Sequence, residues 1–480
     1  MFCFKTFSCV FIVVVISFYY EELSRLRNWK SSDREHTTLA IGVLSGRENF
    51  ELRKAVRSTW LRKNSSKSRV KTWFVLGNSS CEIPPEYRLD LYSCEKWSIN
   101  ISDLQEKFYT AYQVKNTSYL INSEKLFYQG FTFQVNYPVV ITKLGILSSL
   151  LLQNSDIKVA VMDVQSKEII VQALISSNKT NNVHGYVYAN VDTIMLLPKN
   201  YEGLILVEGY LKETASSNTV WNNGGGVITF KRVYPTSEHL ESKKYSSNLN
   251  VASSIGFYIP DVENLKRIAN NEELVTKKWL LHLEELNKRL RIEIEEKNDI
   301  FIASVMDTYR SLPAKLLEFY KWLHLNYDFT FVLKTDDDSV LDISRLLKQL
   351  MEDSRLKYGQ PWLWSNFRKN WPVNYIGKWT DYDYQSSVYP TFPCGAAYVM
   401  SRQIVQWLVL NAETLHNYQG EDVSMGIWLS AINPEFIEDE NFECDVRCHH
   451  KSYNRAQLGY DEIIKVWSYY KNCQNLCSCD

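Results

Sequence analysis

Residues 329–347 read FTFVLKTDDDSVLDISRLL and join an apolar run directly to three aspartates, Asp336, Asp337 and Asp338. In this run, the odd-numbered and the even-numbered residues are both largely apolar. This is typical of a parallel strand that is covered on both faces. If the chain stays extended, Asp336 and Asp338 point to one side and Asp337 to the other. Because carboxylate oxygens suit Mn²⁺ or Mg²⁺, and open α/β sheets bind ligands at the carboxyl ends of strands, we predict a metal and diphosphate site here. The alternative is a solvated acidic turn before a helix that starts near Asp342.

Strand and helix patterns alternate on both sides of this stretch. Residues 37–45 and 69–77 have the pattern of strands, with a helical pattern at 51–61 between them. A long helical period fills 272–296, and 299–326 read as a strand, a turn and a helix with Pro313 in its first turn. This alternation predicts a parallel α/β sheet.

The intervening residues have a different character. Residues 80–260 alternate apolar with polar positions, broken by Asn, Gly and Ser, and show no long helical period. The pattern predicts an all-β, sandwich-like domain inserted into an α/β domain formed by 37–79 and 261–480. Its role stays open between packing and docking of a substrate.

The N-terminus carries a membrane-type segment. Residues 1–20 combine a short tail with an uncharged apolar run, and 21–36 form a polar stem. We expect a signal anchor with a lumenal catalytic part, although the basic residues after the run do not favour that orientation. A cleaved signal peptide and a buried core helix are the alternatives.

Sequons and cysteines support a lumenal location. Of the ten cysteines, the eight beyond residue 20 form an even set that can pair in an oxidising compartment. We predict a disulfide between Cys81 and Cys94, which close a short loop, and leave the other pairings open. A zinc cluster of the C-terminal cysteines with His449 and His450 is the alternative, but its spacing is not that of a zinc finger. The sequons lie at Asn64, Asn78, Asn100, Asn116 and Asn178.

The charge balance argues against nucleic acid as a partner. The formal net charge is −1, so nothing attracts a polyanion. No P-loop or DxDxT segment occurs, which argues against a phosphotransferase.

A second acidic pair opens the stretch YQGEDVSMGIWLSAI, residues 418–432. Its apolar spacing predicts a helix with Gly420 before it and Glu421 and Asp422 in its first turn. The helix dipole keeps a carboxylate there ionised, as a general base requires. A stabilising acidic helix start is the alternative.

A third stretch, YPTFPCGAAYVMSRQIVQWLV at 389–409, offers space near the backbone at Gly395 before a helix that begins near Arg402. Aromatic residues precede it, and aromatic faces pack well on sugar rings, with ordinary core packing as the alternative. These aromatics are Trp362, Trp364, Trp371, Tyr375 and Trp379. We place Trp379, Tyr389, Gly395 and Glu421 on the side of an acceptor substrate.

Taken together, the motifs LRKAVRSTW, FVLG, MDTYRSLPAK, LKTDDDSV, YPTFPCGAAYV and GEDVSMGIW occur in the same order as in the β-1,3-glycosyltransferases of family 31. The chain resembles this family, whose members are inverting enzymes of the GT-A fold, over nearly its whole lumenal part. The resemblance implies transfer of GalNAc from UDP-GalNAc to a terminal β-linked GlcNAc of a glycoprotein glycan, of the O-mannosyl or another type. It also implies a Mn²⁺ or Mg²⁺ cofactor and a type II protein of the Golgi or endoplasmic reticulum membrane. Transfer of galactose or GlcNAc, or a lumenal glycan-binding protein without catalysis, are the alternatives.

The resemblance also implies roles for single residues. Asp338, with Asp336, holds the metal, and Asp422 deprotonates the acceptor 3-hydroxyl. Many relatives supply a histidine downstream of the Glu-Asp helix as a further ligand, but SYNRAQLGY at 452–460 has none, which leaves His449 or His450 as substitutes. The implied donor-binding residues are Ser45, Arg53, Arg57, Asp336 and Asp337.

Overall fold

The structure is a computed structural model. It describes residues 35–61, 70–102, 104, 108–116, 120–153, 156–176, 182–214, 218–235, 252–356, 361–374, 377–381, 383–445 and 448–479. The expected anchor at 1–20, nearly all of the stem, Tyr375 and the sequons at Asn64 and Asn178 lie outside these residues. Within the described ranges, no helix is long and apolar enough to cross a membrane.

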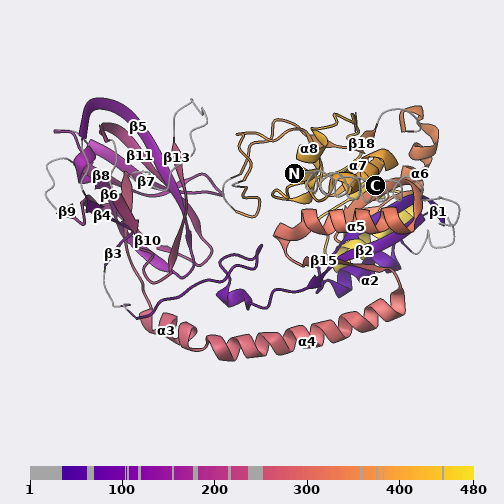
Figure 1. Ribbon diagram of the computed structural model, residues 1–480, viewed down its shortest axis with the longest axis horizontal. Helices are drawn as coiled ribbons and strands as arrows, with labels where there is room; N and C mark the ends of the chain where they lie inside the picture. Colours follow the sequence, from indigo (N-terminus) through magenta and orange to yellow (C-terminus); the bar gives the residue numbers. More distant parts are fainter. Residues whose placement is uncertain are drawn as a thin grey trace, which may run out of the picture.

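A seven-stranded sheet with the strand order β15-β2-β1-β16-β21-β18-β22 forms one half of the molecule (Figure 1). Its first four strands run parallel, as the sequence predicts, and β16 carries the stretch that ends in the aspartates. Strand β21 runs antiparallel to both of its neighbours, so the sheet is mixed. The strands are β1 (His36–Leu44), β2 (Val70–Ser79), β15 (Ile300–Met306), β16 (Asp328–Asp336), β18 (Trp362–Ser365), β21 (Ala397–Ser401) and β22 (Glu435–Glu438).

Helices cover both faces of this sheet, which explains why both side-chain sets of β16 are buried, among them Val332 and Leu333. One core cluster joins the sheet to α2, α6 and α9, and a second joins it to α5, α7 and α8. The helices are α2 (Phe50–Ser58), α5 (Leu312–Asn326), α6 (Ile343–Glu352), α7 (Arg402–Asn411), α8 (Glu421–Leu429) and α9 (Tyr460–Cys473). Asp342 caps α6 by accepting a 3.0 Å hydrogen bond from the Arg345 N–H.

Two five-stranded antiparallel sheets lie between β2 and β15 in the chain, with the orders β3-β14-β6-β10-β9 and β13-β5-β11-β7-β8. Side chains from both sheets form one core cluster, which includes Phe131, Ile141 and Val159. The strands are β3 (Tyr109–Thr110), β5 (Leu120–Val135), β6 (Val139–Leu147), β7 (Asp156–Asp163), β8 (Ile169–Ser176), β9 (Asn182–Val183), β10 (Tyr186–Leu197), β11 (Glu202–Thr214), β13 (Ile228–Pro235) and β14 (Ser253–Tyr258). The antiparallel strands predicted for this region are therefore present.

Helices α3 (Val262–Asn270) and α4 (Glu272–Lys297) lead from these sheets back to β15. Figure 1 shows α4 running along one side of the molecule, from the β-rich part to the seven-stranded sheet. Shorter strand pairs are β4 (Tyr112–Asn116) with β12 (Asn218–Trp221), β17 (Val340–Leu341) with β23 (Asn454–Arg455), and β19 (Phe367–Arg368) with β20 (Phe392–Pro393).

Four disulfides join the eight cysteines of the described ranges. The predicted pair Cys81–Cys94 is confirmed. The others are Cys394–Cys444, Cys448–Cys477 and Cys473–Cys479. These sulfurs are bonded to one another, so the C-terminal cysteines do not form the alternative zinc cluster.

Candidate active site

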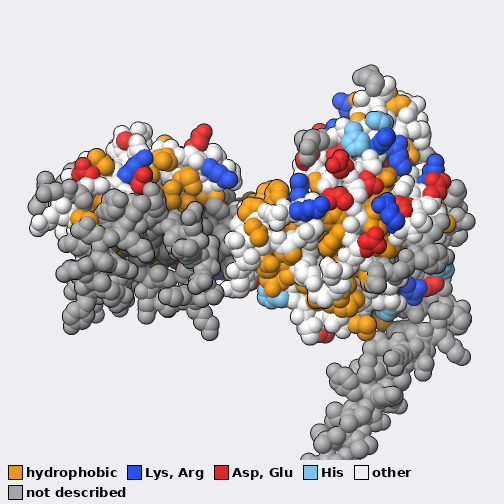
Figure 2. Space-filling view, turned by 90° about the horizontal axis from the view of Figure 1, so that it is seen from above, with side chains coloured by type: hydrophobic (Ala, Val, Ile, Leu, Met, Phe, Trp, Pro, Cys, Tyr) orange, Lys and Arg blue, Asp and Glu red, His pale blue; other side chains and the backbone are white. Residues whose placement is uncertain are grey.

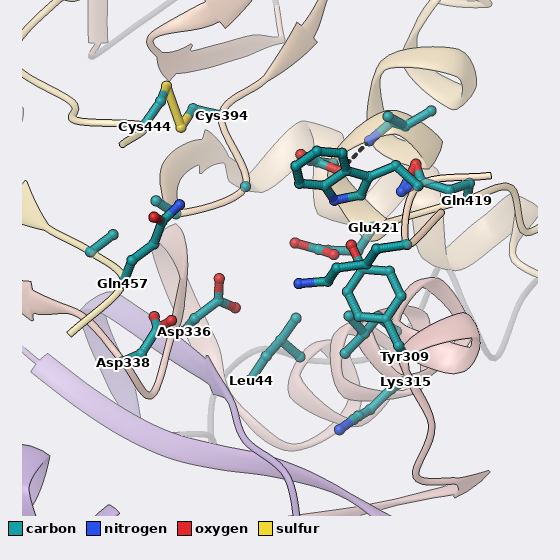
Figure 3. Close-up of a pocket in the computed structure, with 18 of the residues that line it drawn as sticks. Leu44, Tyr309, Lys315, Asp336, Asp338, Cys394, Gln419, Glu421, Cys444 and Gln457 are labelled. Carbon is teal, nitrogen blue, oxygen red and sulfur yellow. Dashed lines mark hydrogen bonds between the residues drawn. A yellow bond between two sulfur atoms is a disulfide. The ribbon is translucent and has the colours of Figure 1, made fainter. Parts of the chain in front are cut away.

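A cavity of about 770 Å³ lies where β1, β15 and β16 end, and α8 and the loop before it complete its wall (Figure 3). It is lined by Ser45 after β1, by Asp307 and Tyr309 after β15, by all three aspartates, and by Glu421 and Asp422 of α8. The carboxyl ends of the parallel strands meet at one edge of the sheet, so motifs far apart in sequence converge here.

The three aspartates diverge as the strand alternation predicts. Figure 3 shows the carboxylates of Asp336 and Asp338 directed into the cavity. Asp337 is buried and accepts hydrogen bonds from Ser45 Oγ at 2.6 Å and Asn49 Nδ2 at 2.9 Å. Its role in the structure is therefore to hold the end of β16 against the loop that follows β1.

Lys334 is a buried cation beside the cavity, and it was not predicted from the sequence. Its side chain is fully buried, lies 2.9 Å from Asp336 Oδ1, and donates to Glu421 Oε1 and the Gly395 carbonyl. Burial alone lowers the pKa of Lys334, but the charges of Asp336 and Glu421 outweigh that effect and raise it, so the ammonium group persists. Its position two residues before Asp336 on one strand could have revealed this contact, because such residues share a face.

Asp422 lies in the first turn of α8, after Gly420, whose φ of 70° favours glycine. Burial and the neighbouring charge of Glu421 raise the pKa of Asp422 to about 7. A carboxylate that titrates near neutral pH can act as a general base. Gly395 makes room for it, since a Cβ on Gly395 would lie 2.9 Å from Asp422 Oδ2. Gly395 therefore lines the cavity and also lies against the carboxylate of Asp422.

More acidic than basic side chains line the cavity. Burial raises the pKa of Asp336 to about 8 and that of Asp337 to about 6, and it also raises the pKa of Asp338. The second buried lysine, Lys315, is already paired with Asp307 at 2.6 Å. An excess of hard oxygen donors with raised pKa values is the environment that a divalent cation would relieve. Within the described ranges, however, no three His, Cys, Asp or Glu side chains are grouped closely enough to hold a metal.

Tyr309 also lines the cavity, and its place in the site was not predicted from the sequence. Gln419 and Trp379 line the cavity with it, and Lys378 Nζ lies 4.6 Å from its ring centroid. Burial raises the pKa of Tyr309, with the nearby charges of Glu421 and Asp422 adding to the effect. The position of the DTYR segment after β15, at the same sheet edge as the aspartates, is the signal that could have identified it.

The aromatic residues divide between the rim and the core. Trp371 and Trp379 line the cavity and remain 40% and 55% exposed, respectively. Tyr389 lines it from a buried position and donates a hydrogen bond to Asp381 Oδ2 at 3.1 Å. Trp362 and Trp364 are buried in the sheet core, which confirms ordinary packing for these two.

The two predicted arginines lie behind the cavity and do not line it. Arg53 is fully buried, pairs with Glu293 at 2.7 Å, and donates to Ser45 Oγ at 3.0 Å. Arg57 pairs with the same Glu293 at 2.6 Å and with Asp299 at 2.8 Å. Arg53 therefore contacts a residue that lines the cavity, Ser45. Among the described residues, Arg57 has no such contact and is linked to Arg53 by their shared partner Glu293.

The loop without the expected histidine places Gln457 in the cavity. Figure 3 shows Gln457 beside Asp338, and the next residue, Leu458, donates its N–H to the Asp338 carbonyl at 3.0 Å. Neither His449 nor His450 is among the described residues that line the cavity. His449 Nε2 lies 3.5 Å from Glu443 Oε1 instead.

The sequons within the described ranges are at accessible positions where the side chain is described. Asn78 follows closely on the buried part of β2 and is exposed, and Asn100 is exposed in the segment before β3. Asn100 Oδ1 accepts a hydrogen bond from its own sequon hydroxyl, Ser102 Oγ, at 2.6 Å. Asn116 ends β4.

Comparison with known proteins defines the class to which this fold and site belong. Residues 280–439 match the family model described as Galactosyltransferase. A shorter match, 30% identical over 165 residues, covers 34% of this chain and 50% of mouse Beta-1,3-galactosyltransferase 6. With the longer matches that follow, these findings show that the chain belongs to the galactosyltransferase family of β-1,3-glycosyltransferases.

Within this family, the similarity to one group of enzymes extends over nearly the full length. The chain is 34% identical over 454 residues to UDP-GalNAc:beta-1,3-N-acetylgalactosaminyltransferase 2 of Xenopus laevis, covering 92% of each chain. It is 33% identical over 471 residues to the Danio rerio enzyme of that name, covering 95% of this chain and 94% of the other. For the Homo sapiens enzyme the identity is 32% over 474 residues, with 96% and 92% covered.

Proposed function

We propose that this protein is a metal-dependent β-1,3-N-acetylgalactosaminyltransferase. Its donor is UDP-GalNAc, and its acceptor is a terminal β-linked GlcNAc on a glycoprotein glycan, of the O-mannosyl or another type. The observation that carries the proposal is that Asp422 and the pair Asp336 and Asp338 line one cavity, with Lys334 joining Asp336 to the first turn of α8. The names of the relatives that match over nearly the full length support the choice of donor.

The donor nucleotide binds where β1 and β16 end. Ser45 lines this part of the cavity, and Arg53 and Asp337 hold its hydroxyl from two sides. Asp336 faces the sugar and ribose, whereas Arg57 supports Arg53 through their shared partner Glu293. The two arginines thus contribute to donor binding by fixing the loop after β1, since neither lines the cavity.

A divalent cation fits the donor set that the chain offers. Asp336 and Asp338 would hold Mn²⁺ or Mg²⁺, and the amide oxygen of Gln457 would be a neutral ligand. When bound, such an ion stabilises the negative charge of the departing diphosphate. Its charge would also offset the carboxylates that raise one another's pKa in the cavity.

Asp422 is the general base. Its carboxylate accepts the proton of the acceptor 3-hydroxyl, and that oxygen forms a bond to the anomeric carbon as the bond from this carbon to UDP breaks. Attack from the face opposite UDP inverts the anomeric centre, so an α-linked donor gives a β-linked product. Trp379, Tyr389, Gly395 and Glu421 line the acceptor side, where Gly395 leaves room for the Asp422 carboxylate.

The same reasoning extends to organisation and location. We assign 37–79 and 261–480 to a GT-A-type catalytic domain interrupted by a β-rich domain at 80–260, after an anchor at 1–20 and a stem at 21–36. The four disulfides and the exposed Asn78 and Asn100 support a lumenal catalytic domain of a Golgi or endoplasmic reticulum protein. Sensitivity of the cell-expressed protein to an N-glycan-removing enzyme is expected, and its absence would contradict this location.

A donor panel tests the activity. Purified protein with Mn²⁺ and a GlcNAc-terminated acceptor should transfer radiolabel from UDP-GalNAc in preference to UDP-galactose and UDP-GlcNAc. The shorter matches to β-1,3-galactosyltransferases make galactose the second candidate. Asp338→Ala and Asp422→Asn should each abolish turnover while leaving the yield of folded protein unchanged. Full activity in either variant would refute the assigned roles, and glycan binding without any transfer would favour the non-catalytic alternative.

A further inference from the structure

The segment that leads into the β-rich part contributes Leu91 to the lining of the cavity. Leu91, which follows the first half of the Cys81–Cys94 loop, lines the cavity with 61% of its surface exposed. The ring of Tyr92 packs edge-on against Tyr309, with centroids 5.8 Å apart, and its carbonyl accepts the Arg310 N–H at 3.1 Å. Tyr92, in the segment that leads into the β-rich part, thus contacts both Tyr309 and Arg310, which follow β15.

A second contact comes from within the β-rich part itself. The carboxylate of Glu202, the first residue of β11, faces the backbone of Gly377. Its Oε2 lies 3.8 Å from the point that a Cβ on Gly377 would occupy, and Gly377 has a φ of 77°. Figure 2 shows the β-rich part and the other half of the molecule as two lobes that meet near the middle of the view.

The contact falls on a compact turn, Gly377 to Thr380. The Gly377 carbonyl accepts the Thr380 N–H at 3.2 Å and the Thr380 Oγ1 at 2.7 Å. Arg310 Nη1 donates to the Thr380 carbonyl at 2.6 Å, and its charge also faces Glu202. Arg310 therefore holds one end of the turn by a hydrogen bond, and the Glu202 carboxylate lies beside the other end.

This turn carries two side chains that line the cavity. Lys378 lies over Tyr309, and Trp379 lines the same cavity while more than half of its surface stays exposed. An exposed indole at the rim is a surface on which a sugar ring packs. The position of the turn thus determines where an acceptor glycan meets the cavity.

We propose that Glu202 is a positioning residue for the acceptor: it holds the Gly377–Thr380 turn, and with it Trp379, at the rim of the cavity. The β-rich part is then a component of acceptor recognition, although it lies outside the seven-stranded sheet. This inference rests on the proposed transferase function.

The test compares variants by steady-state kinetics with UDP-GalNAc and a GlcNAc-terminated acceptor. Glu202→Ala should raise the KM for the acceptor about tenfold, equivalent to about 1.4 kcal/mol, without changing the KM for UDP-GalNAc. Hydrolysis of UDP-GalNAc without acceptor should also stay unchanged, because the donor side is untouched. Glu202→Gln keeps the size of the side chain and an oxygen beside Gly377, and it should behave like the wild type. Glu208→Ala, at an exposed position of the same strand, is the matched control.

A second variant keeps the proposal testable if Glu202→Ala does not fold. Thr380→Val removes the side-chain hydrogen bond within the turn, leaves the β-rich part intact, and should give the same selective rise in acceptor KM. An unchanged acceptor KM in Glu202→Ala or Thr380→Val, or a parallel rise in both KM values, would overturn the proposal. If the wild type transfers no sugar, both the proposed function and this inference fail. If the wild type is active but the variants keep its acceptor KM, only this inference is refuted.

Discussion

Replacing Gly395 by alanine separates two explanations for this glycine. A ligand that needs the space beside Gly395 would bind more weakly to the variant, so its KM would rise and kcat would be retained. The structure gives a different expectation, because the nearest atoms to the added methyl group belong to Asp422 and Glu421. Gly395 does not have a positive φ, so alanine brings no backbone strain at this position.

The size of the effect follows from the geometry. The new Cβ would lie 2.9 Å from Asp422 Oδ2, whereas ordinary contacts begin at 3.4 Å, so the carboxylate must move by about 0.5 Å. Since a misplacement of about 1 Å can cost roughly 10²-fold in rate, a shift of half that size should lower kcat about tenfold. This loss corresponds to about 1.4 kcal/mol of transition-state stabilisation.

The assay is initial-rate kinetics with UDP-GalNAc and a GlcNAc-terminated acceptor, together with thermal unfolding of each variant. Gly459→Ala is the control, because its added methyl group would meet no atom closer than 3.6 Å. We expect Gly395→Ala to lose kcat while its KM values and unfolding temperature stay near those of the wild type. A raised KM with unchanged kcat would refute the reasoning and restore the ligand-space explanation.

Three further predictions concern acid–base behaviour, stability and metal affinity. Because Asp422 must be ionised to accept a proton and its pKa is raised to about 7, kcat/KM should rise with pH between 6 and 8; a flat profile over this interval would exclude Asp422 as the base. Glu293→Ala leaves the fully buried Arg53 without its carboxylate partner and should cost about 3–5 kcal/mol in urea unfolding, whereas Glu295→Ala on the exposed face of α4 should cost little; equal midpoints would contradict this. Gln457→His places an imidazole beside Asp338 and should lower the Mn²⁺ concentration that gives half-maximal binding; unchanged or weaker Mn²⁺ binding would show that Gln457 does not face the ion.

Local patterns were sufficient to predict the elements that carry the site. The two apolar faces of 329–333 predicted a covered strand, and alternation predicted that Asp337 would diverge from Asp336 and Asp338; both predictions are confirmed. The helical spacing that placed Asp422 in a first turn is also confirmed. These features depend only on neighbours along the chain, which is why periodicity detects them.

Side-chain contacts between residues that lie far apart in the sequence were not predicted. Arg53 meets a carboxylate 240 residues away on α4, and no local pattern marks Glu293 as its partner among the many acids of that helix. The nearness of Gly395 to the Asp422 carboxylate was not predicted for the same reason, because Asp422 belongs to α8. Glu202 is a further case, since its partner lies in a loop of the other half of the molecule.

The most direct test of the central claim is the structure of the product. Nuclear magnetic resonance of the oligosaccharide formed from UDP-GalNAc and a GlcNAc-terminated acceptor reports both the linkage position and the anomeric configuration. Direct displacement with Asp422 as the base predicts a single β-linked GalNAc on O3 of the terminal GlcNAc, and none with Asp422→Asn. An α-linked product, or the same product from Asp422→Asn at the wild-type rate, would contradict the account.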